Sequence, residues 1–357
     1  MRRLRLRSAD FRLAAGPLAR TCAGALVALA ALAAQTQAWA SDGSGAAAPL
    51  GSAQVPLPTD VAGWIARVQR AALERSYVGT FVVTTDAGAT TGSRIWHARE
   101  GDRHMERIEA LDGPARTIFR RNGEMRTFFH ASRTVVTEPL QRALPFPGAV
   151  PALAAGLDRW YRAERLGRQR VAGLDADVVW LRPRDALRFG YRIWSEQGSG
   201  LVLRLQTVQA DGHVREQASF LQVDLGTPVS LPALAREMED TRGYRALAQL
   251  APRELPPEEV AWTLREAVPG FSYQGCRASG TRGEAVQCTY ADGLASVSLF
   301  FETRDGAVPA QTLARWSAGA TQALARPLDA QTWLTVVGEV PAATLALFAE
   351  RLVRVRK

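Results

Sequence analysis

The chain has 357 residues, and its 44 lysines and arginines against 35 aspartates and glutamates give a formal net charge of +9. Six of the basic residues and one acidic residue lie among the first forty positions. Without that leader, 38 basic and 34 acidic residues remain, a net charge of +4. No basic run survives outside the leader, which argues against a nucleic-acid-binding protein.

The N-terminus carries an export signal. Its arginine-rich leader is followed by an uncharged apolar run, Cys22–Ala34, shorter than the ~20 residues that a membrane-spanning helix needs. Ala38 and Ala40 then flank one residue, as signal peptidase requires, so we expect residues 1–40 to be a signal peptide cleaved after Ala40. An uncleaved anchor is the alternative. Residues 41–58 have the composition of a flexible tether.

The first predicted elements are a helix and a run of strands. Thr59 or Asp60 can cap a helix whose apolar positions recur at helical spacing up to Arg75. Runs rich in β-branched and aromatic residues follow at 77–85, 93–99, 104–111, 115–121, 124–130 and 133–139. The dipeptide at 122–123, asparagine then glycine, predicts a hairpin, as does Asp112-Gly113.

A proline-rich segment, 145–153, interrupts the strands. They resume at 175–183, 189–196, 201–209 and 214–225, with apolar and polar residues alternating. Tyr191 and Ile193, for example, share one face of their strand. Meandering antiparallel strands with few helices predict an α+β domain over 59–226.

Five prolines around one predicted helix indicate an interdomain linker at 227–257. A second, smaller α+β domain is predicted at 258–357. It contains strand-like segments at 261–268, 295–302 and 332–340, and a closing helix from Pro341 to Arg354.

Two cysteines, Cys276 and Cys288, remain after the leader. In an oxidising compartment an even pair predicts one disulfide. A two-thiolate metal site is the alternative, but no histidine lies near either cysteine.

A search for catalytic chemistry finds no nucleophile elbow, zinc-protease motif, phosphate loop or dinucleotide loop. His97, Glu100, His104 and Glu106 form one cluster that could be weighed as a metal site, but their spacing matches no ligand set, and a solvated hairpin is favoured. We therefore expect no enzyme, no catalytic residue, no metal and no cofactor.

Nine aromatic residues lie on predicted strands of the first domain, enough for either an ordinary core or an apolar cavity. Strand alternation predicts six inward-facing side chains that would line such a cavity: Phe81, Val83, Trp96, Ile108, Tyr191 and Ile193.

Several segments resemble the MucB/RseB family of periplasmic regulators of the envelope-stress sigma factor. They include SYVGTFVV, RNGE, RVAGLDADVVWLRPRDALRFGYRIW, GLVLRL, YADGLASVSLFFE and TVVGEVPAAT, in order along the chain. The resemblance implies an unclosed antiparallel β-barrel under helices, like that of lipoprotein carriers, followed by a smaller α+β domain. The Cys276/Cys288 pair is a departure from the family pattern.

The resemblance also implies a function. The protein would bind the periplasmic segment of a membrane-spanning anti-sigma factor, shield it from regulated proteolysis, and be released by mislocalised lipopolysaccharide or lipoprotein acyl chains. A periplasmic lipid or lipoprotein carrier is the alternative, and a hydrolase of unseen type is a weaker one. A homo-oligomer is left open.

Overall fold

The computed structural model describes residues 57–121, 123–139, 146, 156–248, 252–279, 285–303 and 313–355. The predicted signal peptide, its cleavage after Ala40 and nearly all of the tether lie outside these residues. The chain divides into two compact units, Met1–Gln54 and Val55–Lys357, and the second is described below. Among the described helices, none combines the length and the apolar character that crossing a membrane demands.

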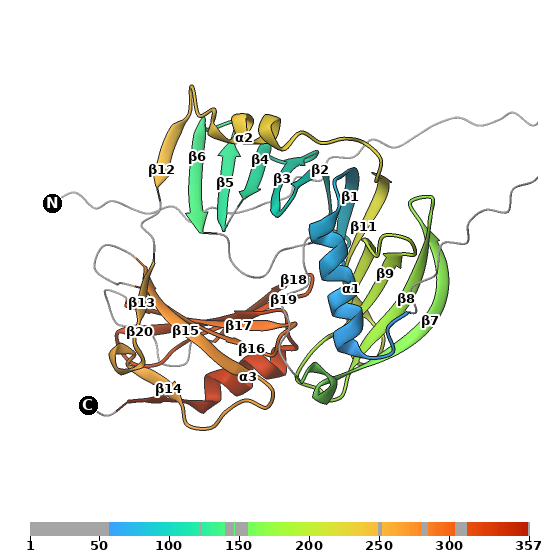
Figure 1. Ribbon diagram of the computed structural model, residues 1–357. Helices are drawn as coiled ribbons and strands as arrows, with labels where there is room; N and C mark the ends of the chain where they lie inside the picture. Colours follow the sequence, from blue (N-terminus) through green and yellow to red (C-terminus); the bar gives the residue numbers. More distant parts are fainter. Residues whose placement is uncertain are drawn as a thin grey trace, which may run out of the picture. The chain divides into compact units, whose positions relative to one another are not determined.

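Within the described residues, twelve strands form a first sheet (Figure 1). They are β1 (Tyr77–Thr85), β2 (Thr90–Glu100), β3 (Arg103–Ala110), β4 (Arg116–Arg121), β5 (Glu124–Phe129), β6 (Thr134–Pro139), β7 (Tyr161–Val171), β8 (Leu174–Pro183), β9 (Gly190–Glu196), β10 (Val202–Val208), β11 (Val214–Asp224) and β12 (Arg245–Ala248). Their order across the sheet is β12-β6-β5-β4-β3-β2-β1-β11-β10-β9-β8-β7. The sheet is open, with β12 and β7 at its edges, and antiparallel except for the parallel pair β12 and β6.

Helix α1 (Val61–Glu74) packs on one face of this sheet, near β7 and β10. Of the two predicted capping residues, Thr59 and Asp60, it is Asp60 that caps the helix, because its carboxylate accepts the Gly63 N–H at 2.7 Å. The apolar residues of the helix that join the sheet's core recur at helical spacing: Val61, Trp64, Ile65 and Val68. A short 3₁₀ helix, η1 (Leu157–Arg159), lies beside α1.

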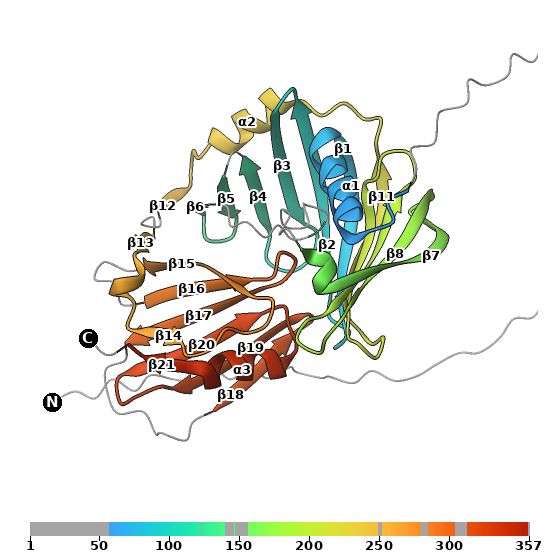
Figure 2. The same cartoon turned by 60° about the horizontal axis from the view of Figure 1, so that its bottom comes forward.

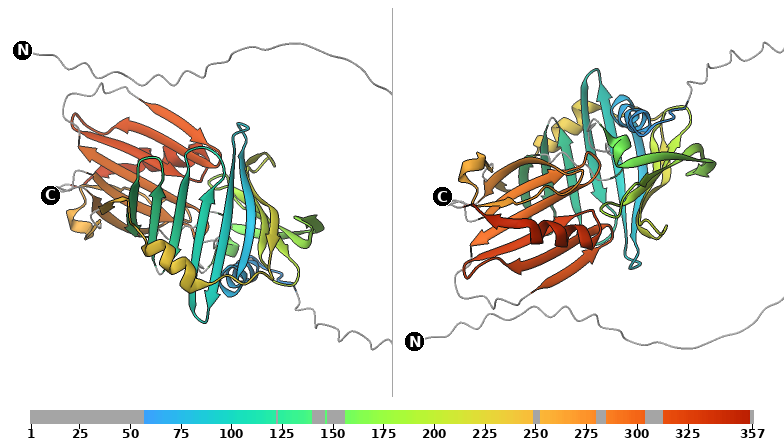
Figure 3. Two further views of the ribbon diagram at one scale, coloured as in Figure 1. Left: turned by 90° about the horizontal axis from the view of Figure 1, so that it is seen from above. Right: turned by 90° about the horizontal axis from the view of Figure 1, so that it is seen from below.

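Helix α2 (Leu231–Glu239) packs on the opposite face, against β2 and β3 (Figure 3). The two faces can be told apart on β4, where Ile118 contacts the α1 side and its neighbour Phe119 packs with Leu234 on the α2 side. Strand β12 then adds to the sheet edge beside β6.

The segment predicted as a linker, 227–257, therefore contributes a helix and a strand to the first sheet. Its prolines do not prevent this, because Pro232 occupies the first turn of α2, where a missing N–H costs nothing. The helices also cover less of the first sheet than the family resemblance implies. In the described part of the chain, strands dominate, and one helix lies on each face.

A second sheet has seven antiparallel strands in the described residues from 252 onward. They are β13 (Arg253–Leu255), β15 (Ser272–Ser279), β16 (Ala285–Ala291), β17 (Ser296–Thr303), β18 (Ala314–Ala318), β19 (Thr321–Pro327) and β20 (Thr332–Gly338), in the order β13-β15-β16-β17-β20-β19-β18. A two-stranded ladder joins β14 (Trp262–Leu264) to β21 (Leu352–Arg354), and a 3₁₀ turn, η2 (Pro257–Glu259), precedes β14.

Helix α3 (Ala342–Arg351) covers one face of the second sheet and packs on β19 and β20 (Figure 2). The predicted closing helix extended to Arg354 and is therefore too long by three residues. Residues 352–354 pair as β21 with β14, where the β-branched Val353 lies opposite Thr263. Pro341 caps the helix and does not occupy its first turn.

Candidate functional site

Five of the six predicted cavity residues lie on the α1 side of the first sheet. Four belong to the buried core there and one packs against it: Phe81, Ile108, Tyr191 and Ile193, with Val83 partly buried. Phe146 packs against one member of this group, with its ring 5.5 Å from that of Phe81, and it also lies 5.3 Å from the ring of Phe220. These side chains therefore form a packed apolar face beneath α1.

Trp96 lies on the other face, so its assignment to the apolar face was wrong. It pairs with Val78 and Arg107, and its ring is covered by the guanidinium groups of Arg94 at 4.9 Å and Arg107 at 4.3 Å. The adjacent Ile95, fully buried, takes the inward position. Successive strand residues point to opposite faces, so an error of one residue moved the largest side chain of the strand to the wrong side.

The same α1-side face carries a buried row of polar groups that sequence reasoning missed. Register places Tyr77, His97, Glu106 and Arg120 side by side on β1, β2, β3 and β4. Arg120 Nη1 lies 3.2 Å from Glu106 Oε2, and both residues are more than nine-tenths buried. The sequence did contain a signal for this row. Each of these polar residues lies an even number of positions from an inward-facing apolar residue of its own strand, and so on the same face of the sheet.

Burial dominates the electrostatics of this row. It raises the pKa of Tyr77 well above its ordinary value, and the Glu106 carboxylate raises it further. Burial lowers the pKa of His97, whose Nδ1 lies 2.6 Å from the Arg75 carbonyl oxygen. Within the described residues, the Tyr77 hydroxyl has no hydrogen-bond partner. The row thus favours neutral Tyr77 and neutral His97 around one ion pair.

The four residues weighed as a metal site do not converge. His97 and Glu106 lie in the buried row, whereas Glu100 forms an exposed ion pair with Arg103 at 2.8 Å. Across the ranges that the structure describes, no group of three or more histidine, cysteine or acidic side chains could hold a metal ion.

A second buried cluster joins the loop between β8 and β9 to the second sheet. Arg188 Nη1 lies 2.8 Å from Asp292 Oδ2, and neither side chain is exposed. The other guanidinium nitrogens are also used, since Nε donates to Asp185 at 2.9 Å and Nη2 to the Pro269 carbonyl oxygen at 2.8 Å. Tyr161 donates its hydroxyl to the same Asp292 oxygen at 3.0 Å.

The remaining groups of this cluster are satisfied as well. Asp292 Oδ1 accepts the backbone N–H of Leu294 and of Ala295 at 2.8 and 2.7 Å. Thr344, at the start of α3, donates its hydroxyl to the Leu187 carbonyl oxygen at 2.8 Å. Charge-assisted bonds of this completeness fix the geometry of the loops that supply them.

A smaller contact lies at the turn between β18 and β19. The Gly319 carbonyl oxygen accepts from Arg215 at 3.3 Å, and the Ala320 N–H donates to Glu216 at 3.4 Å. Burial raises the pKa of Glu216. Residues of β11 therefore contact the second sheet at a point separate from the Arg188 cluster.

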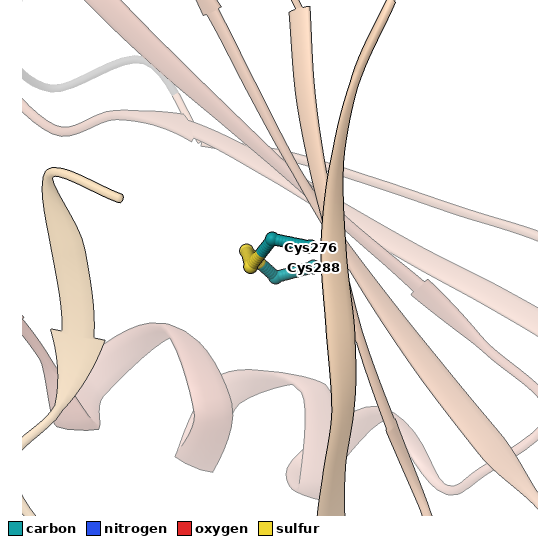
Figure 4. The surroundings of a disulfide bond; sticks show 2 residues. All are labelled: Cys276 and Cys288. Carbon is teal, nitrogen blue, oxygen red and sulfur yellow. A yellow bond between two sulfur atoms is a disulfide. The ribbon is translucent and has the colours of Figure 1, made fainter. Parts of the chain in front are cut away.

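Cys276 and Cys288 form a disulfide between β15 and β16, where the two residues are directly paired (Figure 4). Both are 3% exposed and belong to the core of the second sheet. The register continues from Leu255 through both cysteines to Leu299, so the disulfide forms part of a buried apolar row.

Two family models match the chain. Residues 60–242 match the MucB/RseB N-terminal domain, and residues 256–353 match the MucB/RseB C-terminal domain. The chain is 30% identical over 298 residues to the sigma factor AlgU regulatory protein MucB of Pseudomonas aeruginosa, covering 80% of this chain and 88% of that protein. It is 23% identical over 276 residues to the sigma-E factor regulatory protein RseB of Escherichia coli K12, covering 72% and 80%.

Solved structures agree with these matches. The crystal structure of MucB in complex with MucA(peri) is 27% identical, has a TM-score of 0.63, and covers 82% of this chain and 98% of that one. The complex structure of Pseudomonas aeruginosa MucA/MucB has a TM-score of 0.64 at the same identity and coverage.

Proposed function

The chain belongs to the MucB/RseB family, and from this premise we propose that it is a negative regulator of an envelope-stress sigma factor. It binds the periplasmic segment of a membrane-spanning anti-sigma factor. The observation that carries this proposal is the likeness over nearly the whole length of MucB in its complexes with MucA, where 98% of the MucB chain is covered. Because that relative is seen in complex with MucA, the likeness supports a protein-binding role for this chain.

The finer mechanism is also part of the proposal. The exported protein, cleaved after Ala40, shields the anti-sigma segment from the first regulated proteolytic cut. Mislocalised lipopolysaccharide or lipoprotein acyl chains release it. A lipoprotein-carrier-like first domain, 59–226, receives the acyl chains, and the second domain, 258–357, helps to bind the anti-sigma segment.

The packed apolar face supports an acyl-binding role for the first sheet. Phe81, Tyr191 and Ile193 are buried there in the core that residues of α1 join, and Phe146 packs against Phe81. An acyl chain could enter this apolar face only if α1 or Phe146 moved. The acyl chain would then replace the apolar contacts of the displaced group, so little buried apolar area would be lost. Differential binding of the ligand to this opened form would shift the protein away from its anti-sigma-bound form.

The test is a protection assay. The mature protein is mixed with the anti-sigma periplasmic segment and the site-one protease, and cleavage is followed over time. We expect the segment to survive with the protein present and to be cut again after lipopolysaccharide is added. A zwitterionic phospholipid at the same concentration controls for a detergent-like effect.

The result that would overturn the proposal is rapid cleavage in the presence of folded protein. That outcome would favour the alternative, a lipid or lipoprotein carrier, for which the apolar face alone is sufficient. Deleting 258–357 separates the two further once the remaining domain is shown to fold without Asp292, the partner of Arg188, because a carrier would keep its cellular phenotype and a two-domain regulator would lose it.

A further inference from the structure

The second sheet contains a pocket that lies apart from the apolar face of the first sheet. It has a volume of about 550 Å³ and is bordered by the second sheet on one side and by the β14–β21 ladder on the other. Cys276, Cys288 and Leu299, neighbours on three adjacent strands, form its sheet side. Trp262 and Leu352 come from the ladder. The disulfide is therefore part of the pocket wall.

The lining of this pocket is apolar and uncharged. Its sixteen residues include no aspartate, glutamate, lysine, arginine or histidine, and its polar side-chain groups are the hydroxyls of threonine, serine and two tyrosines and the indole N–H of Trp262. Trp262 and Phe301 lie with parallel rings, 6° apart in orientation and 6.5 Å between centroids. Because burying a charge without a partner is costly, the part of a ligand that enters this pocket has to be uncharged.

The ladder strand that borders the pocket also carries a cation, Arg354, next to the lining residue Val355. Arg354 pairs directly with Trp262 across the ladder, so both side chains leave the ladder on the same face as Leu264 and Leu352, which line the pocket. The Arg354 side chain is 70% exposed, and its contact with Asp329 is long, at 3.7 Å. This cation is thus held loosely beside an apolar opening.

Two acidic groups near the pocket, Glu259 and Asp329, are already engaged. Glu259, two residues beyond the lining residue Pro257, lies 2.8 Å from Arg253. Asp329 accepts the backbone N–H groups of Gln331 and Thr332 at 2.9 and 2.7 Å. Arg354 is therefore a weakly paired charge beside the lining, and as a cation it favours an anionic ligand group.

We propose that this pocket binds the hydrocarbon chain of a single-chain anionic amphiphile, a fatty acid, with the carboxylate held at Arg354. A volume of about 550 Å³ falls in the roughly 300–1,000 Å³ range of small-molecule sites. One chain fits this space, whereas the several acyl chains of a lipopolysaccharide together exceed it. The site is separate from the anti-sigma and lipopolysaccharide functions proposed above and does not depend on them.

The first experiment is competition on the mature protein. Bound cis-parinaric acid is displaced by palmitate, by laurate, and by hexadecyltrimethylammonium, which has a sixteen-carbon chain and a cationic head. We expect palmitate to compete best and laurate, which is four methylenes shorter, to be weaker by about two orders of magnitude, because each buried methylene contributes roughly fourfold to affinity.

Two matched variants test the headgroup. Arg354→Glu should lower the affinity for palmitate about three- to tenfold and raise the affinity for hexadecyltrimethylammonium. Arg315→Glu, on the exposed edge strand β18 of the same sheet, makes the same charge change away from the pocket and should leave both affinities unchanged. Equal responses of the two variants would exclude the assigned headgroup contact.

Photocrosslinking locates the hydrocarbon chain directly in the wild-type protein, and one lining variant serves as its control. Palmitate bearing a diazirine near its methyl end should label β14, β15, β16 or β21, and Leu264→Glu, which places a carboxylate in the lining, should abolish that labelling. Labels confined to the first sheet, or displacement by none of the amphiphiles, would overturn the proposal.

Discussion

Arg188 and Asp292 form an ion pair with both side chains fully buried, although 104 positions separate them in the chain. Arg188 belongs to the loop before β9 and Asp292 to the turn after β16. Removing two such charges from water costs several kcal/mol for each ion, which their attraction only partly returns. We therefore expect the pair to specify which loops meet rather than to add greatly to stability.

Breaking one side of this pair should be costly. Arg188→Met leaves the Asp292 carboxylate buried without its cation, and we expect a loss of about 3–5 kcal/mol in the free energy of unfolding. Adding Asp292→Asn should restore part of that loss, since the amide oxygen can still accept from Leu294 and Ala295. Urea unfolding of the single and double variants measures this coupling.

The control is the exposed pair of Arg242 and Asp240, with nitrogen and oxygen 2.6 Å apart. The same substitutions there should change stability little, because water screens both charges. If Arg188→Met were no more harmful than Arg242→Met, the buried pair would not have the role assigned to it.

His97 should make the fold sensitive to acid. Burial lowers its pKa in the folded protein, so below the ordinary histidine value of about 6.5 the unfolded chain binds a proton that the folded chain resists. Stability should thus fall as the pH drops through and below that value. His97→Gln should flatten this part of the curve of unfolding free energy against pH.

His213 provides the comparison, since its side chain is 56% exposed. The His213→Gln protein should keep the pH dependence of the wild type. An unchanged curve in the His97 variant would instead assign the acid sensitivity to other groups.

The disulfide should stabilise the second sheet. Cys276 and Cys288 are twelve positions apart, and closing a loop of that size contributes about 3 kcal/mol in the chain-entropy model. Replacing both with alanine should lower the unfolding free energy by roughly that amount. Reductant should destabilise the wild type and leave the alanine variant unaffected, and a reductant effect on both would contradict this origin.

The cap of α1 offers a milder change. Asp60→Ala removes the acceptor for the Gly63 N–H and should cost about 1 kcal/mol, whereas Asp60→Ser keeps an acceptor and should cost less. Because α1 covers the apolar face, amide hydrogen exchange should speed up in 61–64 before it does in β1. Uniform acceleration in both segments would mean that α1 does not open separately.

Local signals in the sequence were sufficient for much of the fold. The cap at Asp60 and the amphipathic spacing after it predicted α1 to within a residue. The hairpin between β4 and β5 was expected from residues 122–123, and Gly123 indeed has a positive φ of 81°. Each of these features depends on neighbours in the chain, which is why pattern and propensity were enough.

Features that depend on distant partners were missed. The parallel pairing of β12 with β6 joins segments more than a hundred residues apart, so a proline-bearing segment looked like a linker. Asp292 was not singled out, because nothing nearby in the sequence revealed that Arg188 would lie against it. The two-domain division at 59–226 and 258–357 stays a prediction.

The parallel strand β12 has a mechanical consequence. It ends at Ala248, and the second sheet's first strand begins at Arg253, so the covalent reach from Ala248 to Pro252 is at most about 15 Å. Were the Arg188 cluster and the Arg215–Gly319 contact to open, Ala248 and Pro252 would have to stay within this distance of each other, so relative motion of the two sheets would pivot near these two residues. Spin labels placed far from that pivot would then report a large change in distance, and labels beside it a small one.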